Sequence, residues 1–330
     1  MKKINITEQH ISPIKLEKQR QKAYKMTTLS KKVPIIAFFL FMIIPTIKLI
    51  ALLTASAEIR ENIKSYLLYY LVHDAFMALI GAVLVFLVLF ILSQKAYNLF
   101  NSNFKNKYIL DTLKELSDFE NLSYNAPMSY SFEEIKEAAI IPPGTKNFFI
   151  SNDNLTGSFK NINFRSGSIM TSESNANHQR LLFSGQVIEF SYFDKSKISD
   201  GRVQVFSNKS LAFYQKLYDK SNEELMHDGK LGYKIETEDT DFNSRFCVYS
   251  DNEHNAFYIL TPNVLENIKA MAETAEDNLY IVFNREKLFV ALNSWQNPFD
   301  VYLDVSIEEQ KTYFKKSTAL LQNAVSILIK

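Results

Sequence analysis

An uninterrupted apolar run places the strongest constraint on this chain. Residues 75–92, AFMALIGAVLVFLVLFIL, contain no charged side chain, and residues 33–53 form a second apolar stretch that includes one lysine. At about 1.5 Å of rise per residue, a helix of this length spans roughly 27 Å, which matches the hydrocarbon core of a bilayer. The two stretches therefore predict a transmembrane helical hairpin over residues 33–92.

Basic residues flank this hairpin unevenly. Residues 1–32 form a basic tail with nine Lys and Arg, whereas the loop between the spans has only Arg60 and Lys64, offset by three acidic residues. Lys and Arg are retained on the cytoplasmic side of a membrane. We therefore expect a two-pass protein with both termini in the cytoplasm.

A cleaved signal peptide is the alternative interpretation of the first apolar stretch. Ala55-Ser56-Ala57 has the small-x-small pattern that signal peptidases accept. The basic lead and the apolar run are both longer than in a typical signal peptide, which favours a retained span. Under either interpretation, the second span leaves the following residues in the cytoplasm.

Lys48 is the charged residue inside the first stretch. It lies within two turns of the outer end, so its side chain can extend toward the membrane surface. A transport or proton-relay role would need a second ionisable partner within the spans, and the sequence shows none. We therefore expect Lys48 to extend toward the surface.

Charge is divided between the two parts of the chain. Residues 1–92 have a net charge of +7, and residues 93–330 have a net charge of −6. A negative soluble part argues against nucleic acid as a ligand. The basic tail suits anionic lipid headgroups, although the orientation rule alone also explains its lysines.

Cys247 is the only cysteine, which excludes an intramolecular disulfide and suggests a buried thiol.

Helical periodicity continues beyond the second span. Apolar residues recur every three or four positions and predict a helical stalk over residues 93–122, followed by one soluble domain over residues 123–330. Ser131 and Glu134 form a capping-box pattern that starts a short helix, and the Pro-Pro-Gly sequence at 142–144 ends it.

Short β-branched and aromatic segments follow, separated by Asn, Asp, Gly and Ser. Thr261-Pro262 predicts a helix start, and Ser306 with Glu309 predicts the start of a final helix. This order predicts an α+β domain with an antiparallel sheet and flanking helices. The predicted strands are residues 148–150, 163–170, 181–193, 202–206, 233–236, 245–249 and a hairpin of 279–283 with 287–292.

Several short motifs resemble one family. They are Phe104-Lys105-Asn106-Lys107, a predicted turn at Asp153-Asn154-Leu155-Thr156-Gly157, Phe183-Ser184-Gly185, the segment FNSRFCVYS at 242–250 and the segment AFYILTP at 256–262. With the two early spans, they resemble the bacterial membrane proteins catalogued as domain of unknown function 3137. Phe257 stands where that family usually has a basic residue. The resemblance implies a location in the bacterial inner membrane and no defined activity.

No catalytic, cofactor-binding or metal-binding residues emerge from the sequence. The five histidines are scattered, and the acidic segment at 236–241 has Ser244 where a calcium loop needs glycine and Ser250 where it needs glutamate. Glycine-rich nucleotide loops and a GxSxG elbow are absent from the sequence. Cys247 and His254 could form a thiol pair, but a cysteine in an apolar strand is usually inert.

Three functions remain open at this point. The first, which we favour, is a membrane-anchored cytoplasmic binding or scaffolding module of unknown ligand, which could be a protein partner, a peptide or a lipid headgroup. The second is an enzyme at the inner face of the membrane, which would need a cleft of convergent polar groups. The third is a structural subunit of a membrane complex.

Overall fold

A computed structural model describes residues 11–54, 57–115, 119–175, 178–191, 201–218, 221, 225, 231–276, 278–284, 286–294 and 299–328. The chain divides into two compact units. One comprises Met1–Phe104 and Tyr302–Ile307, and the other comprises Lys105–Val301 and Glu308–Lys330. The tail residues 1–10 and the Ala55-Ser56 pair of the predicted cleavage motif lie outside the described residues.

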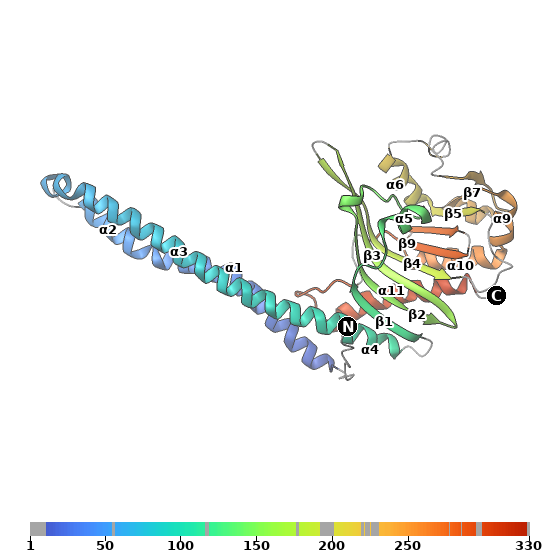
Figure 1. The fold of residues 1–330 in the computed structure, drawn as a ribbon, viewed down its shortest axis with the longest axis horizontal. Coiled ribbons are helices and arrows are strands. Elements are labelled where there is room, and N and C mark those ends of the chain that lie inside the picture. The colour runs from blue at the N-terminus through green and yellow to red at the C-terminus, as the bar shows by residue number, and fades with distance from the viewer. Residues whose placement is uncertain are drawn as a thin grey trace. The chain divides into compact units, whose positions relative to one another are not determined.

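The first unit is a helical hairpin made of α1 (Pro13–Phe41), α2 (Ile43–Thr54) and α3 (Ala57–Asn103). In Figure 1, α3 runs back alongside α1 over most of its length. Ser12 caps α1 by accepting a hydrogen bond from the Lys15 amide, and Pro13 occupies the first helical position. Most of the expected basic tail and of the loop between the spans is therefore helical.

Small side chains let the helices of the hairpin approach closely. Within α1 the buried residues are Leu16, Ala23 and Ser30, seven residues apart, which is the spacing of a coiled-coil seam. Ala78 and Ala82 are buried on α3, and a Cβ added to Gly81 would lie 2.9 Å from the Phe41 ring. Close approach through small residues is typical of helix pairs in lipid.

The second unit contains a nine-stranded sheet of described strands, in the order β1-β2-β3-β4-β9-β8-β5-β7-β6, and every pairing is antiparallel. The α+β prediction is confirmed. The strands are β1 (Phe119–Pro127), β2 (Ile150–Phe159), β3 (Ile162–Asn175), β4 (His178–Ser191), β5 (Arg202–Ser207), β6 (Tyr233–Ile235), β7 (Phe246–Ser250), β8 (Leu279–Asn284) and β9 (Lys287–Leu292).

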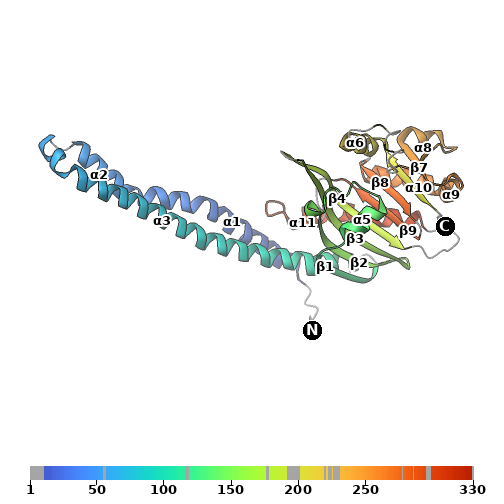
Figure 2. The same ribbon diagram turned by 45° about the horizontal axis from the view of Figure 1, so that its top comes forward.

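Helices cover both faces of this sheet, with α5 in front and α11 behind in Figure 2. Alternate residues therefore point into two apolar layers. Val187 and Phe289 pack in one core with Ile135 of α5, whereas the adjacent Ile188 and Val290 are buried on the opposite face. The helical segments are η1 (Phe104–Tyr108), α4 (Ile109–Lys114), α5 (Phe132–Ala138), η2 (Lys146–Phe148), α6 (Asn208–Tyr218), α8 (Thr240–Arg245), α9 (Glu253–Ile259), α10 (Pro262–Thr274) and α11 (Ile307–Ser326).

Several local predictions are confirmed. Ser131 and Glu134 form a complete capping box at α5. The predicted hairpin is β8 with β9, in which Asn284 pairs with Lys287. The final helix begins at Ile307. α10 begins at Pro262 as expected, although the Thr261 side chain makes no capping hydrogen bond.

Two local predictions are wrong. The helix expected to continue to residue 122 ends at Lys114, and β1 begins at Phe119 and pairs with β2. The segment Asp153–Gly157 is not a turn, because it lies inside β2. The register of β2 against β3 shifts between Asn152 and Leu155, and Asp153 adopts a φ of 60°. This is a β-bulge, in which an extra residue of a turn-forming type interrupts a continuous strand.

Candidate functional site

The helical hairpin presents apolar side chains outward along both of its chains. Among the described residues, two helical segments are long and apolar enough to cross a membrane, and only 11 % of the most apolar stretch of each is buried. Large side chains such as Phe39, Ile47, Phe76 and Leu84 are each more than 40 % exposed. Soluble proteins rarely expose a contiguous apolar surface of this extent, so the surface marks a contact with lipid or protein.

Lys48 has an ionisable partner, which corrects the expectation that the spans contain none. Its ammonium donates a hydrogen bond to the Asp74 carboxylate on α3. His73 Nδ1 lies 3.6 Å from Asp74 Oδ1, and the Lys48 ammonium lies 6.0 Å from the centre of the Tyr70 ring. Asp74 immediately precedes the apolar run that begins at residue 75, so the sequence placed it in a loop, whereas α3 extends through it.

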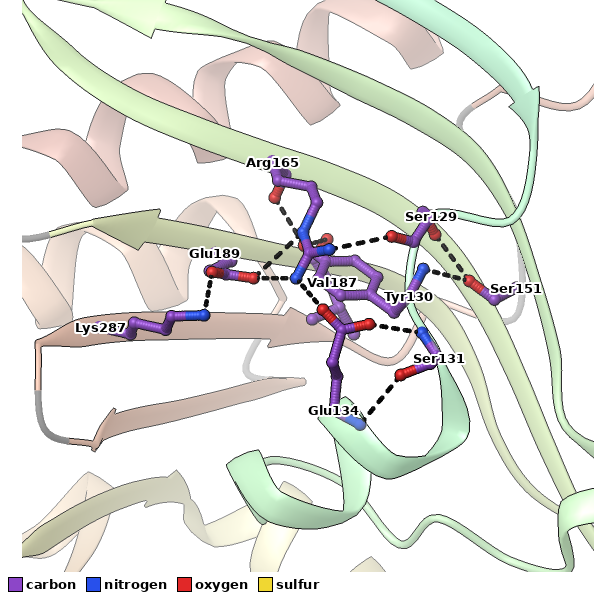
Figure 3. A network of polar contacts seen from close by, with 9 residues as sticks. All are labelled: Ser129, Tyr130, Ser131, Glu134, Ser151, Arg165, Val187, Glu189 and Lys287. Carbon is purple, nitrogen blue, oxygen red and sulfur yellow. Dashed lines mark hydrogen bonds and ion pairs between the residues drawn. The ribbon is translucent and has the colours of Figure 1, made fainter.

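The second unit contains a polar network centred on Arg165, drawn in Figure 3. Arg165 on β3 lies directly opposite Glu189 on β4 in the strand register. Its guanidinium donates to Glu189 at 3.1 Å through Nε and to Glu134 on α5 at 2.7 Å through Nη2. Lys287 on β9 contacts the other oxygen of Glu189 at 2.7 Å. Three strands and one helix therefore contribute one charge each.

The Tyr130 ring packs against the Arg165 guanidinium in this network. The guanidinium carbon of Arg165 lies 4.3 Å from the centre of the Tyr130 ring, within the range of a cation–π contact. The Tyr130 hydroxyl donates to the Arg165 carbonyl at 2.6 Å, and the Tyr130 amide donates to Ser151 Oγ at 2.8 Å. The aromatic ring therefore positions the arginine through both its face and its hydroxyl.

The electrostatics of the network favour fixed charges. Burial disfavours the charged form of Arg165, but the bonds to Glu189 and Glu134 outweigh it and raise the pKa of the guanidinium. Burial also opposes ionisation of Glu134, yet bonds from the Ser131 amide and from Arg165 lower its pKa. Burial raises the pKa of Tyr130 well above 10. None of these shifts brings the pKa of Arg165, Glu134 or Tyr130 close to neutral pH, where the pKa of a general acid or base would lie.

A second buried ion pair joins η1 to the bulge in β2. The Lys105 ammonium lies 2.7 Å from Asp153 Oδ1, and the Tyr124 hydroxyl donates to the same oxygen. Asp153 is 1 % exposed. η1 is a π-helical turn, and Asp153 has a left-handed backbone conformation. Both features are found frequently at functional sites. Two of the motifs noted in the sequence therefore meet in this ion pair.

The acidic segment and Cys247 occupy structural positions. Asp239 caps α8 by accepting from the Phe242 amide at 2.9 Å and also binds Lys269 at 3.0 Å. Cys247 is only partly buried, which corrects the expected buried thiol; its Sγ lies 3.4 Å from Asn208 Oδ1, and burial raises the pKa of the thiol. Within the part of the chain that the structure describes, His, Cys, Asp and Glu side chains form no group of three that could hold a metal ion.

A comparison with known families gives a match over less than half of the chain. Residues 181–329, from β4 to α11, match the family described as "Protein of unknown function (DUF3137)". The resemblance inferred from the motifs is therefore confirmed for this stretch, which includes the motifs at 183–185, 242–250 and 256–262. No curated protein and no solved structure matches the chain.

Proposed function

We propose that this protein is a two-pass membrane protein whose sheet-containing unit acts as a binding or scaffolding module on the cytoplasmic side. The outward apolar surface of the hairpin is the observation that carries this proposal. A soluble protein would have to expose that surface to water, at a cost of about 25 cal/mol for each Å² of apolar area. Lipid removes this cost.

Charge distribution supports the orientation. The basic residues cluster on α1 before the apolar run, so the positive-inside rule keeps both termini in the cytoplasm. The location that we propose is the bacterial inner membrane, which the resemblance of the motifs at 183–185, 242–250 and 256–262 to bacterial membrane proteins implies. The net negative charge of residues 93–330 disfavours nucleic acid as a ligand of this module.

Anionic lipid headgroups are proposed ligands of only part of the basic segment. Lys31 and Lys32 are exposed and directly precede the apolar run. Lys15 lies 18 residues from Val33 along the same helix, which is about 27 Å for a helix parallel to the membrane normal. Attraction to a charged surface decays over about 8 Å at physiological salt. Lys31 and Lys32 are therefore the residues that headgroups would reach.

Recognition of a protein partner fits the sheet-containing unit better than catalysis does. Arg165, Lys105 and Lys269 are each held by carboxylates of the same unit. Charged groups committed to internal pairs stabilise a rigid platform, whereas catalytic groups need a pKa matched to their task. This arrangement supports a scaffold presented at the membrane surface.

Membrane fractionation and cysteine labelling test the proposal. In a Cys247→Ser background, we introduce single cysteines at Arg60, near the expected outer end of the hairpin, and at Lys15. Carbonate washing should leave the full chain in the membrane fraction. An impermeant maleimide added to intact cells should label Arg60→Cys and leave Lys15→Cys unlabelled. Release by carbonate contradicts membrane insertion, and the opposite labelling pattern contradicts the orientation.

A further inference from the structure

The Lys48–Asp74 ion pair lies within the apolar part of the hairpin. Leu49, Ile50 and Leu53 extend beyond Lys48 on α2, and Tyr69 and Val72 precede Asp74 on α3; each of these five side chains is more than 40 % exposed. On the other side of the pair, Ile44 and Ile47 on α2 and Phe76 and Met77 on α3 are also more than 40 % exposed, so apolar surface borders the ion pair on both sides along the helices. In a membrane, such surface places the pair within the lipid-facing region and below the headgroups.

Two helices cannot enclose this pair. Lys48 is 37 % exposed and Asp74 is 24 % exposed, so both charged groups are accessible from outside the hairpin. Ionisable residues in membrane spans almost always face the interior of a helix bundle, because lipid leaves their remaining hydrogen-bonding capacity unsatisfied. A hairpin has no bundle interior of its own. The exposed side of the ion pair therefore calls for a polar surface on another molecule.

We propose that a second copy of this chain covers the ion pair, forming a two-fold dimer within the membrane. Lys48 is on α2 and Asp74 is on α3, so the two charges lie side by side across the hairpin. Copies inserted in the same orientation are related by an axis along the membrane normal. Rotation by 180° about that axis places Lys48 of each copy opposite Asp74 of the other copy.

The resulting ring alternates positive and negative charge, and this complementarity favours a second copy over other occupants. An anionic headgroup would attract Lys48 but repel Asp74 by a similar amount, because the pair has no net charge. A different membrane protein would need its own matched pair at the same depth. The chain itself supplies such a pair with the required symmetry. This inference rests on the membrane insertion proposed above.

Charge reversal in separate copies gives a specific test. Lys48→Asp leaves two acidic groups in one copy, and Asp74→Lys leaves two basic groups. Neither variant can restore its own ion pair or pair with itself. When the two variants are expressed together with different tags, however, the two acidic groups of the Lys48→Asp copy lie opposite the two basic groups of the Asp74→Lys copy, so both contacts join opposite charges. Any rescue must therefore act between copies.

Co-purification of the two tags from mild detergent measures the dimer. The wild-type chains should co-purify, and each reversal variant expressed with itself should co-purify about tenfold less or lower, because like charges cost more than 1.4 kcal/mol at such a contact. The mixed reversal pair should recover the wild-type level. Lys15→Asp makes the same change of charge at an exposed position on α1 that the headgroups do not reach, and it should leave co-purification unchanged. A mixed pair no better than the single variants overturns the proposal.

A neutral variant separates dimer formation from folding of the hairpin. Lys48→Leu with Asp74→Leu should remain in the carbonate-resistant fraction and lose co-purification. Wild-type chains released by carbonate would refute the proposed function, whereas retained chains that do not co-purify refute the dimer alone. Undiminished co-purification of the Leu–Leu variant, or recovery of a different membrane protein in place of the second tag, also overturns the proposal.

Discussion

At the scale of single residues, Arg165 shows how this sheet uses partly buried charge. Its guanidinium binds two carboxylates and stacks on Tyr130, so it connects β3, β4 and α5. Removing one member of a fully buried ion network costs about 3–5 kcal/mol, because the remaining charges keep their desolvation penalty, whereas Arg165 is 27 % exposed and solvent lowers this cost. The contribution of Arg165 to the free energy of unfolding therefore depends on its contacts with both carboxylates and with Tyr130.

We expect Arg165→Met to lower the free energy of unfolding by about 2 kcal/mol, because Glu134 and Glu189 lose their common cation in a network that is only partly buried. Thermal unfolding of the full chain in detergent measures the change. Arg180→Met is the matched control on the neighbouring strand, since Arg180 is 43 % exposed and lies 3.9 Å from Glu173. Exposed pairs are worth at most about 1 kcal/mol, so equal effects of the two substitutions would contradict a structural role for the network.

At the scale of elements, the pairing of β4 with its neighbours depends on a glycine. A Cβ placed on Gly185 would lie 1.9 Å from the carbonyl oxygen of Leu292 at the end of β9. Because that atom belongs to the backbone, the two strands would have to separate to admit a methyl group. The Phe183-Ser184-Gly185 motif is therefore explained by a close approach of two strands.

Gly185→Ala should destabilise the protein by about 1–3 kcal/mol, which is the usual cost of overpacking a well-packed region. The midpoint of thermal unfolding should fall by several degrees, since 1 kcal/mol shifts a domain of this size by about 2–4 °C. Gly201→Ala is the control, because its added Cβ would be 3.5 Å from the nearest heavy atom. A stability loss at Gly201 equal to that at Gly185 would refute the steric explanation.

At the scale of the whole molecule, the helical unit joins segments from opposite ends of the chain. The Glu17 carboxylate on α1 accepts from the Ile307 amide at 3.3 Å, and Arg20 donates to the Leu303 carbonyl. The hydrogen bond from Arg20 is the main cause that lowers the pKa of Glu17 from 4.5 to about 2. The unfolded chain therefore binds a proton at higher pH than the folded chain does.

This contribution to stability is complete above about pH 4.5 and is lost as the pH falls through about 2. We expect Glu17→Gln to lower the midpoint of thermal unfolding at pH 7 and to reduce its decline between pH 4.5 and pH 2. Glu236→Gln serves as the control, since Glu236 is 77 % exposed and forms only a surface pair with Lys234. An identical pH dependence in wild type and Glu17→Gln would contradict the linkage.

Local sequence determined the features that depend on neighbouring residues. The length of the two apolar runs specified two long helices, the Ser131–Glu134 capping box specified α5, and Pro262 specified the start of α10. Residues 279–292 likewise specified a hairpin. Each of these signals acts over a few residues, because helical and strand periodicity and capping are local properties.

Only the tertiary structure decided which charges meet. Lys48 and Asp74 are 26 residues apart, Lys105 and Asp153 are 48 apart, and Arg165 and Glu189 are 24 apart. Strand order and register bring Arg165 opposite Glu189, and the bulge in β2 brings Asp153 to Lys105. No periodic pattern encodes such pairs, because they follow from how whole elements pack and their energy arises only once the fold removes them from water.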